Sequence, residues 1–355
     1  MRIKLTSKSR VWLLGSAHLT GGPEALHQLS RALLDIGVDA RIVYCPEREG
    51  GYEVPGPFKI YKPQVATYAE DEDQDVVVVP EMMTWKLNSF KKAQKAVWWL
   101  SVDNYLVRRR PKALVMGAVR RELPLWMWQM SGIAHFVQSY YAESFLTSAG
   151  VPDAMLLTDY LRERVFSATG AMNKDSREDI VLYNPKKGIE FTKRLMSREY
   201  PSCRWVALQG MTAEQVSNLM RQAKLYIDFG NHPGRDRMPR EAAISGCCIL
   251  TGRQGSAGND RDIPTPDFYK VDEKKNGWAD EAAGKIRDVI ANFATHYDAL
   301  AGYRDWIKSQ QAEFLKEVQT AFCANGDHEE DPDRESDVLT LDVGRDASPT
   351  SDAGR

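Results

Sequence analysis

Short apolar runs separated by helical patterns are the main feature of the first half of the chain. The runs are Val11–Leu14, Ala40–Cys45, Asp75–Val79, Ala96–Leu100 and Ile133–Val137. After the first run, Pro23 begins a series of apolar residues at helical spacing, and Gly37 ends it. Continuous apolar runs of this length are typical of parallel strands that are covered on both faces. We therefore expect strands that alternate with helices, including a helix near Tyr141–Ala149.

The second half repeats this alternation. Its expected strands are Ile180–Tyr183, Arg204–Leu208, Leu225–Phe229, Cys247–Leu250 and Phe268–Val271. Thr212 and Gln215 have the spacing of a capping box, and Pro239 suits the start of a helix. The stretch Tyr297–Phe322 indicates one long closing helix or two. The pattern predicts an α/β protein with two doubly wound, Rossmann-like parallel sheets, whose strands present their carboxyl ends to a cleft between the halves.

Length and charge divide the chain further. A chain of 355 residues is longer than one ordinary hydrophobic core supports, and a polar stretch at 164–178 marks the expected junction. We expect one domain at 1–165 and a second at 166–324. From Asn325 onward the chain has ten acidic residues, three basic residues and few apolar ones. Residues 325–355 are therefore expected to form a disordered acidic tail.

The composition argues against several classes of protein. No apolar run approaches the roughly 18–20 residues that span a bilayer, and the N-terminal residues lack the pattern of a signal peptide. The five cysteines have neither zinc-site nor disulfide spacing; they are Cys45, Cys203, Cys247, Cys248 and Cys323. We interpret them as buried thiols and expect a cytoplasmic protein.

The segment Tyr226–Leu250 carries the strongest chemical signal. It reads as a buried strand, a loop rich in glycine and arginine, a helix beginning at Pro239 and a second buried strand. Three arginines and one carboxylate crowd the loop and the first helical turn, namely Arg235, Arg237, Arg240 and Glu241. A helix N-terminus beside guanidinium groups is suited to phosphate, and a carboxylate just inside the helix can bind ribose hydroxyls. The segment therefore predicts a nucleotide-linked ligand.

Two further loops follow expected strands at the same edge of the sheets. Gly21 and Gly22 allow the backbone to approach a ligand closely, although a strand-to-helix turn needs glycine for its own sake. Lys186 and Lys187 lie in the loop Asn184–Gly188, where they can meet a diphosphate or simply form a solvated turn.

These segments together resemble the group 1 family of retaining, nucleotide-sugar-dependent glycosyltransferases. Pro239–Gly246 is similar to the Pro-x-Glu-Ala-x-Ala-x-Gly segment of that family, and Asn184–Gly188 is similar to its Pro-Glu-Lys-Gly turn. Gly21–Glu24 resembles its Gly-Gly loop, and Gln209–Gly210 resembles the segment beside the nucleotide base. The similarity covers about residues 11–320 loosely and is stronger in the second half.

The resemblance implies a GT-B fold and assigns roles to these positions. It places Glu241 on the donor ribose, Lys187 on the donor diphosphate, Gly21 and Gly22 near the donor phosphates, and Gly210 near the base. It also implies that the sugar is transferred with retention of configuration. The family's loops and this chain's loops differ at two places, however. Pro233 occupies the position of a family carboxylate eight residues before Glu241, and Leu182 occupies that of an arginine.

These departures suggest that the contacts to phosphate and sugar are rebuilt. We interpret Arg235 and Arg237 as replacements for the missing phosphate cation, and His232 or Asp236 as a catalytic group facing the donor sugar. The alternatives are that His232 is a turn residue bonded to backbone, and that Asp236 forms an ion pair with Arg235 or Arg240.

The first half offers candidates for the acceptor side of the reaction. Asp103 ends a buried strand, where it can orient an acceptor hydroxyl, stabilise positive charge at the anomeric carbon or cap a loop. Glu81 is a similar candidate, and His18 in the first glycine loop is a candidate donor contact. The basic stretch Arg108–Arg110 and the aromatic stretch Trp126–Trp128 are compatible with peripheral contact at the inner face of a membrane, or with a solvated loop before a core helix.

The sequence thus predicts a glycosyltransferase that moves a sugar from a nucleotide-diphosphate sugar to a hydroxyl of a glycan or glycolipid, as in polysaccharide biosynthesis. No Asp-x-Asp motif is evident, so we expect no metal and no cofactor besides the donor. A recognisable nucleic-acid-binding motif is also lacking, which argues against a nucleic-acid partner. A nucleotide-sugar epimerase and a noncatalytic binding module on the same fold remain alternatives.

Overall fold

The computed structural model describes residues 3–47, 50–151, 153–162, 176–200 and 203–323. The expected junction at 164–178 lies almost entirely outside the described residues, and the expected acidic tail at 325–355 lies wholly outside them. The domain limits at 165 and 324 therefore stay predictions. None of the helices within the described ranges has both the length and the apolar character that a membrane crossing requires.

The first sheet has seven parallel strands in the order β3-β2-β1-β4-β5-β6-β7. These are β1 (Arg10–Gly15), β2 (Asp39–Tyr44), β3 (Gln64–Ala66), β4 (Val76–Pro80), β5 (Gln94–Trp99), β6 (Ala134–Val137) and β7 (Met155–Leu156). The chain leaves β1 in one direction and returns to its other side at β4, so the sheet switches direction between these strands. Val76–Val79 is completely buried, because helices and loops cover both faces of the sheet.

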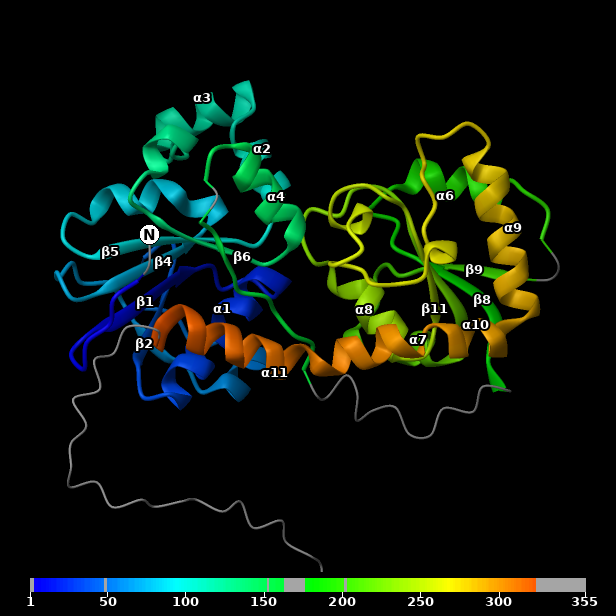
Figure 1. Ribbon diagram of the computed structural model, residues 1–355, viewed down its shortest axis with the longest axis horizontal. Helices are drawn as coiled ribbons and strands as arrows, with labels where there is room; N and C mark the ends of the chain where they lie inside the picture. Colours follow the sequence, from blue (N-terminus) through cyan, green and yellow to red (C-terminus); the bar gives the residue numbers. More distant parts are fainter. Residues whose placement is uncertain (1–2, 48–49, 152, 163–175, 201–202, 324–355) are drawn as a thin grey trace, which may run out of the picture. The chain divides into compact units, whose positions relative to one another are not determined.

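The helices around the first sheet vary in how firmly they pack. They are α1 (Gly21–Asp35), α2 (Val102–Arg108), α3 (Pro111–Arg120) and α4 (Tyr140–Ser148), with the 3-10 helices η1 (Gly56–Tyr61), η2 (Glu81–Ser89) and η3 (Met127–Met130). α1 buries Leu26, Leu29 and Leu33 against the sheet, as its apolar spacing predicts. α3 lies outermost in Figure 1, and Gly117 is its one buried residue.

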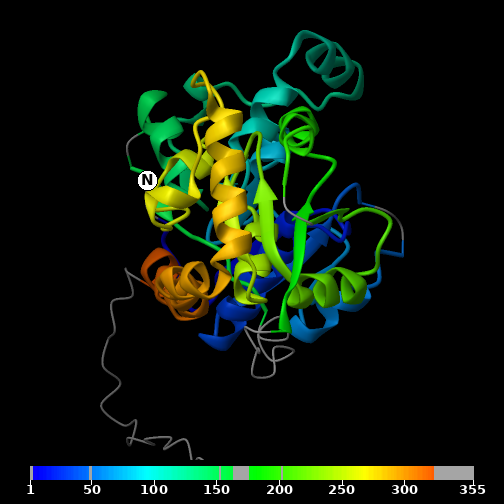
Figure 2. The ribbon, with the colours of Figure 1, turned by 90° about the vertical axis from the view of Figure 1, so that its right-hand side faces the viewer.

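The second sheet has four parallel strands in the order β11-β10-β8-β9. They are β8 (Glu178–Tyr183), β9 (Arg204–Ala207), β10 (Ala223–Asp228) and β11 (Cys248–Thr251), and helices α6 (Ile189–Met196), α7 (Ala213–Gln222), α8 (Arg237–Ile244) and α9 (Trp278–Ala291) flank them. Figure 2 shows α9 lying along this sheet. The predicted pair of doubly wound α/β halves is confirmed. The capping box before α7 is present, since the side chains and backbone of Thr212 and Gln215 hydrogen bond reciprocally.

Two local predictions in the second half are wrong. Phe268–Val271 is not a strand: Asp267–Tyr269 forms the 3-10 helix η6, and only a single bridge joins Thr251 to Lys270. Aromatic packing decides this, because Phe268 stacks on His296 at a centroid distance of 5.0 Å. The helix predicted from Pro239 begins two residues earlier, as α8. A proline fits there because N–H groups of the first helical turn have no helical partner.

The chain closes with two helices, which is the second of the two predicted possibilities. α10 (Phe293–Ala299) is followed by α11 (Ala301–Cys323). The beginning of α11 packs Ile307 into the core of the second half, whereas Phe314 and Phe322 belong to the core of the first half. α11 therefore joins the two cores, as its course in Figure 1 shows.

Candidate functional site

The loops after β8 and β10 meet at the point where the second sheet switches direction. Gly188 and Gly230 adopt left-handed backbone conformations with φ values of 56° and 99°. A Cβ atom at Gly188 would overlap the carbonyl oxygen of Phe229, and one at Gly230 would lie 2.9 Å from the Cα of Gly188. The two loops therefore need glycine to touch. Their contact brings Lys187 to the end of β10, at the edge where such sheets bind ligands.

Lys187 lies in a compact cluster with two carboxylates and a histidine. Its Nζ is 3.0 Å from Oδ1 of the buried Asp228 and also forms a short ion pair with Asp236. His232 is completely buried, with Nδ1 3.0 Å from Oδ2 of Asp236. Burial raises the pKa of Asp236, but the hydrogen bond from His232 and the charge of Lys187 outweigh it and lower that pKa to about 2. Asp236 is therefore an anion at neutral pH.

This cluster is also the place where the described residues offer metal ligands. Ligand atoms of Asp228, His232 and Asp236 lie within 4.8 Å of one another. The ammonium group of Lys187, however, already contacts both carboxylates. The protein thus supplies a cation of its own at this position. Asp228 was not among the residues singled out from the sequence, although a polar residue that ends an apolar strand beside a candidate loop is a usable signal.

Arg237 connects the first turn of α8 with the glycine loop of the first half. Its guanidinium forms an ion pair of 2.5 Å with Glu24 of α1, and its Nε is 3.3 Å from Oε1 of Glu241. A Cβ atom at Gly21 would lie 3.3 Å from Cδ of Arg237, so the glycine loop packs closely beside this side chain. The structure therefore brings Gly21, Arg237 and Glu241 together.

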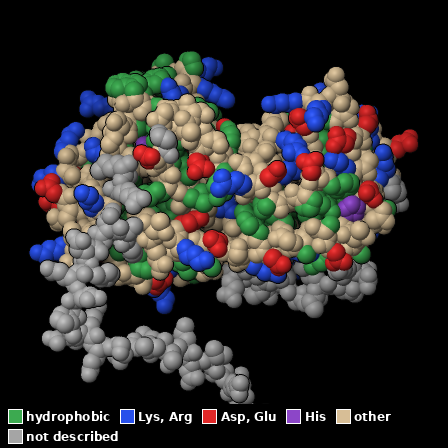
Figure 3. Space-filling model, viewed as in Figure 1, with side chains coloured by type: hydrophobic (Ala, Val, Ile, Leu, Met, Phe, Trp, Pro, Cys, Tyr) green, Lys and Arg blue, Asp and Glu red, His purple; other side chains and the backbone are tan. Residues whose placement is uncertain are grey.

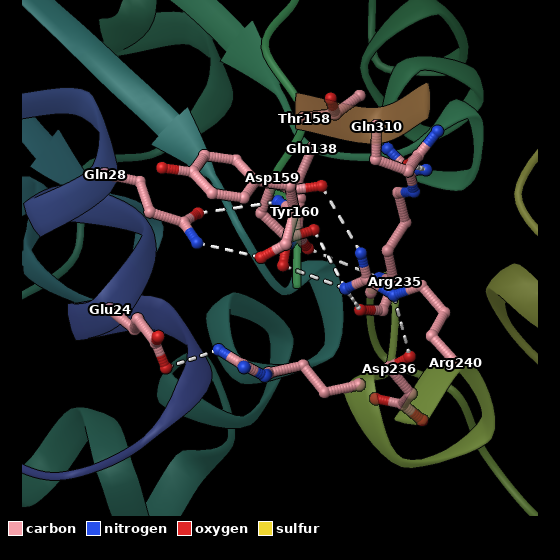
Figure 4. A network of polar contacts seen from close by, with 12 residues as sticks. Glu24, Gln28, Gln138, Thr158, Asp159, Tyr160, Arg235, Asp236, Arg240 and Gln310 are labelled. Carbon is pink, nitrogen blue, oxygen red and sulfur yellow. Dashed lines mark hydrogen bonds and ion pairs between the residues drawn. The ribbon is translucent and has the colours of Figure 1, made fainter. Parts of the chain in front are cut away.

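Arg235 and Arg240 are buried in the interior. Arg240 donates to both carboxylate oxygens of Asp159 at 2.9 and 2.8 Å, and each of these two residues is 2% exposed. Arg235 donates a hydrogen bond to Gln310 (Figure 4). Its guanidinium also lies 4.8 Å from the ring centroid of Trp306. The charge of Arg240 is thus already matched within the protein. Asp236 pairs with Lys187 and His232, rather than with either arginine of the predicted alternative.

A polar cleft of about 290 Å³ lies where these loops face the first half. Its walls include Gly21, Gly22, Lys187, Asp228, Asp236 and Arg237. Ser101 and Asn104 line the side of the first half, next to Asp103. Asp103 itself accepts hydrogen bonds from Asn231 at 2.6 Å and from the hydroxyl of Tyr141 at 3.3 Å, and so ties the β10 loop to the first half.

A larger cavity of about 980 Å³ adjoins the cleft in the first half. Both cavities are lined by Gly22, Leu100, Ser101 and Asn104. The larger one also meets His18, Glu81 and three arginines, which are Arg108, Arg120 and Arg121. Gly210 lies apart from both, at an exposed turn with φ 68° after β9. The arrangement therefore has a small compartment beside a large one.

Glu81 is a buried carboxyl on the wall of the larger cavity. Its Oε2 accepts a hydrogen bond of 2.9 Å from the backbone N–H of Leu100, and burial raises its pKa to about 7. The pKa of Glu81 is higher in the folded state than in the unfolded state. The protonated side chain therefore contributes its full stabilisation below about pH 4.5, and this contribution is lost as the pH rises through about 7. Above pH 7 the wild-type protein therefore holds an ionised carboxylate in a buried site.

We expect Glu81→Gln to raise the free energy of unfolding above that of the wild type, and to do so more at pH 8 than at pH 5. The neutral amide keeps the acceptor oxygen and removes the buried charge, so the gain in the free energy of unfolding approaches about 3 kcal/mol. Urea unfolding of the variant and the wild type at both pH values measures it. Glu53→Gln, at an exposed position, is the control. Its free energy of unfolding relative to the wild type should be the same at both pH values. An equal effect of Glu81→Gln at pH 5 and pH 8 would contradict the assignment.

Comparison with known proteins identifies the fold. No protein-family model matches the sequence, and no curated protein matches it either. Among solved structures, it is similar to WaaG, a glycosyltransferase involved in lipopolysaccharide biosynthesis, with a TM-score of 0.56 and 11% identity over 88% of this chain and 99% of that one. It is also similar to sucrose-phosphate synthase from Thermosynechococcus elongatus, with a TM-score of 0.54 and 13% identity over 89% and 95% of the two chains.

A third similar structure is the N-terminal domain of trehalose-6-phosphate phosphatase from Candida albicans. Its TM-score is 0.54 with 11% identity, over 89% of this chain and 98% of that one. The likeness extends over nearly the whole of each matched chain, so the predicted two-domain GT-B fold is confirmed. At these identities the comparison establishes the fold, and the chemistry has to be argued from the site.

Proposed function

We propose that the protein is a glycosyltransferase that moves a sugar from a nucleotide-diphosphate sugar to a hydroxyl group of a glycan or glycolipid acceptor. The observation that carries this proposal is the convergence of Lys187, Arg237 and the Gly21–Gly22 loop on one cleft. These groups come from both halves and meet where each sheet switches direction, which is the usual ligand site of doubly wound folds. Similarity to WaaG and sucrose-phosphate synthase supports the same class of reaction.

The cleft is suited to stabilising a departing diphosphate. The ammonium of Lys187 pairs with Asp228 and Asp236, and the guanidinium of Arg237 pairs with Glu24. A bound diphosphate competes for both cations. As the bond from the anomeric carbon to the diphosphate breaks, the leaving group takes the electron pair and the cations stabilise its charge. The oxygen of the acceptor hydroxyl forms the new bond to the anomeric carbon, and its proton passes to the departing diphosphate.

We further propose that the reaction needs no metal ion and retains configuration. Support for the first point is that Lys187 already places a positive charge between the carboxylates that offer metal ligands. Support for the second is the resemblance of Pro239–Gly246 and Asn184–Gly188 to segments of the retaining family. In the proposed complex Glu241 binds the donor ribose, and Asp236 on the cleft wall faces the sugar. His232 is buried behind Asp236 and holds this carboxylate in place.

The larger cavity is proposed to take the acceptor, because it adjoins the donor cleft through Ser101 and Asn104. The acceptor is a glycan or a lipid-linked glycan. Arg108–Arg110 and Trp126–Trp128 lie on this side of the first half, which supports peripheral contact with the inner face of a membrane by a cytoplasmic protein.

A thermal-shift panel of nucleotide-diphosphate sugars tests donor binding. A ligand present at about a hundred times its dissociation constant stabilises the folded state by about 2.7 kcal/mol, so one base and sugar should raise the melting temperature clearly above the others. Glu241→Ala should remove this stabilisation, whereas Glu190→Ala, at an exposed position on α6, should keep it. If no nucleotide sugar shifts the wild type, or if Glu241→Ala responds like the wild type, the proposed donor site is wrong.

A further inference from the structure

Large apolar side chains are exposed together on α2, on α3 and on the segment that follows α3. They are Leu106, Val107, Val115, Met116, Val119, Leu123, Trp126 and Trp128, and we call them the α3 surface. Val119 is 77% exposed and Trp128 is 78% exposed. Figure 3 shows hydrophobic side chains gathered over α3, with Lys and Arg side chains beside them. Contiguous apolar surface of this kind indicates a binding partner rather than solvent.

α3 gains little from the body of the protein. Of its ten residues only Gly117 is buried, although the helix sequence contains Leu114, Val115, Met116 and Val119. Its contacts with other elements are mainly with α2. Short helices obtain most of their stability from burying an apolar face. α3 therefore presents to its surroundings the face that a core helix would bury.

The charges around the α3 surface are mainly positive. Residues 101–130 contain six basic and two acidic residues. Arg109 lies 4.1 Å from the ring centroid of Trp126, and Arg108 pairs with Glu122 at 3.5 Å. The remaining basic residues form no ion pair with any described residue; they are Arg110, Lys112, Arg120 and Arg121. Exposed tryptophan and aliphatic side chains bordered by lysine and arginine match the chemistry of an anionic lipid interface.

The same basic residues reach the larger cavity. Arg108, Arg120 and Arg121 line it as well as bordering the α3 surface. Arg121 ends α3 in a left-handed conformation with φ 57°, a position where glycine or asparagine is favoured. The chain thus keeps a cation on the wall of the cavity despite a backbone conformation that disfavours a long side chain. The cavity and the α3 surface therefore adjoin each other.

We propose that the α3 surface docks on an anionic lipid bilayer, with Val115, Met116, Val119 and Trp128 entering the interface and the basic residues facing lipid phosphates. The acceptor cavity then opens toward the bilayer, so that it receives a lipid-borne acceptor. This docking specifies the peripheral membrane contact that we proposed above. It depends on neither donor binding nor sugar transfer.

Co-sedimentation with vesicles tests this docking on the full chain. We expect it to bind vesicles of phosphatidylcholine mixed with phosphatidylglycerol, to bind pure phosphatidylcholine vesicles much more weakly, and to lose the difference at high salt. Val119→Asp and Trp128→Ala should each weaken binding by about tenfold or more. Ile60→Ser, which changes a side chain that is 58% exposed on η1, is the matched control and should bind like the wild type.

Arg121→Gly tests the effect of the positive charge on vesicle binding separately from any effect on folding. Glycine suits the left-handed position, so the melting temperature should stay equal or rise, while vesicle affinity should fall about fivefold with the loss of one cation. Arg204→Ala, which changes an exposed arginine at the start of the edge strand β9, should leave vesicle affinity unchanged. Equal binding to both vesicle types, or unchanged binding by Val119→Asp, would overturn the proposal.

Two other occupants give different results and would also overturn it. If light scattering shows a dimer that Val119→Asp dissociates, and vesicles do not bind, then the α3 surface contacts a second copy. If a duplex oligonucleotide binds in a manner that depends on Arg121 and vesicles do not, then the surface serves a nucleic acid. The thermal-shift response to nucleotide sugars is measured without vesicles, so failure of donor binding is distinguished from failure of docking.

Discussion

Lys187→Met is expected to lower the rate of sugar transfer by at least about a hundredfold. The ammonium group of Lys187 is the cation nearest to both carboxylates of the cleft, and in the proposed reaction it stabilises the charge of the leaving diphosphate. Loss of one well-placed charge-stabilising group typically costs about 10²–10³ in rate. Release of the nucleoside diphosphate from the donor found in the thermal-shift panel measures this effect.

The neighbouring Lys186 provides a matched control. Lys186 is exposed and its side chain forms no ion pair with a described residue, so Lys186→Ala should keep nearly full activity. Lys187→Met also removes the cation that contacts Asp228 and Asp236, which destabilises the fold. The double variant Lys187→Met with Asp236→Asn removes one of these charges and should recover stability without recovering transfer. Wild-type activity in folded Lys187→Met would show that the diphosphate does not bind here.

Asp159→Asn is expected to destabilise the protein by about 3–5 kcal/mol, because it leaves Arg240 charged and buried. Burial raises the pKa of Asp159, but the charges of Arg240 and Arg235 outweigh that effect and hold it below its usual value. A lowered folded-state pKa stabilises the fold above the ordinary aspartate pKa of about 3.9, and this contribution is lost as the pH falls below it. Urea unfolding at pH 7 should show the loss, and at low pH the difference between variant and wild type should shrink.

A double variant that removes both charges tests the effect of the charges separately from the effect of the volume that the two side chains fill. Asp159→Leu with Arg240→Met should be much less destabilised than Asp159→Asn, since it buries no unpaired charge. Asp159 follows the first sheet and Arg240 lies in α8, so this pair ties the two halves together. An Asp159→Asn variant as stable as the wild type would mean that water solvates the charge of Arg240 or that another acidic group neutralises it.

The spacing of apolar residues predicted helices and strands well where that spacing reflects burial in the core. The valines of β4 and the apolar face of α1 are buried as their spacing indicates. The failures have tertiary causes. Phe268 and Tyr269 favour a strand by composition, but their rings pack on His296, which lies in a helix far along the chain.

The site could be located from the sequence, but its detailed contacts could not. Glycines and lysines that follow buried strands indicate the cleft, because parallel strands place such loops at one edge. Which guanidinium faces the cleft depends on partners distant in the sequence. Asp159 takes the charge of Arg240, and Glu24 directs Arg237 toward the glycine loop. No local pattern around residues 235–240 encodes either pairing, since both require the two halves to be folded together.

The α3 surface shows a second limit of local reasoning. The stretch that contains Trp126 and Trp128 has the composition of a core helix as readily as that of a surface. Whether its apolar residues are covered is decided by what packs on α3, and within the described chain that is mainly α2. Exposure of this surface is therefore a property of the folded protein that sequence periodicity alone does not supply.

The most direct test of the central claim follows the sugar of a labelled nucleotide-diphosphate donor. Mass spectrometry and NMR should identify the products that the wild type, Lys186→Ala and Lys187→Met form with and without added glycan or lipid-linked acceptors. From the wild type and Lys186→Ala we expect a glycoside with the donor's anomeric configuration, together with free nucleoside diphosphate. From folded Lys187→Met we expect almost none of either product. An epimerised nucleotide sugar formed without an acceptor, or equal turnover by Lys187→Met, would contradict it.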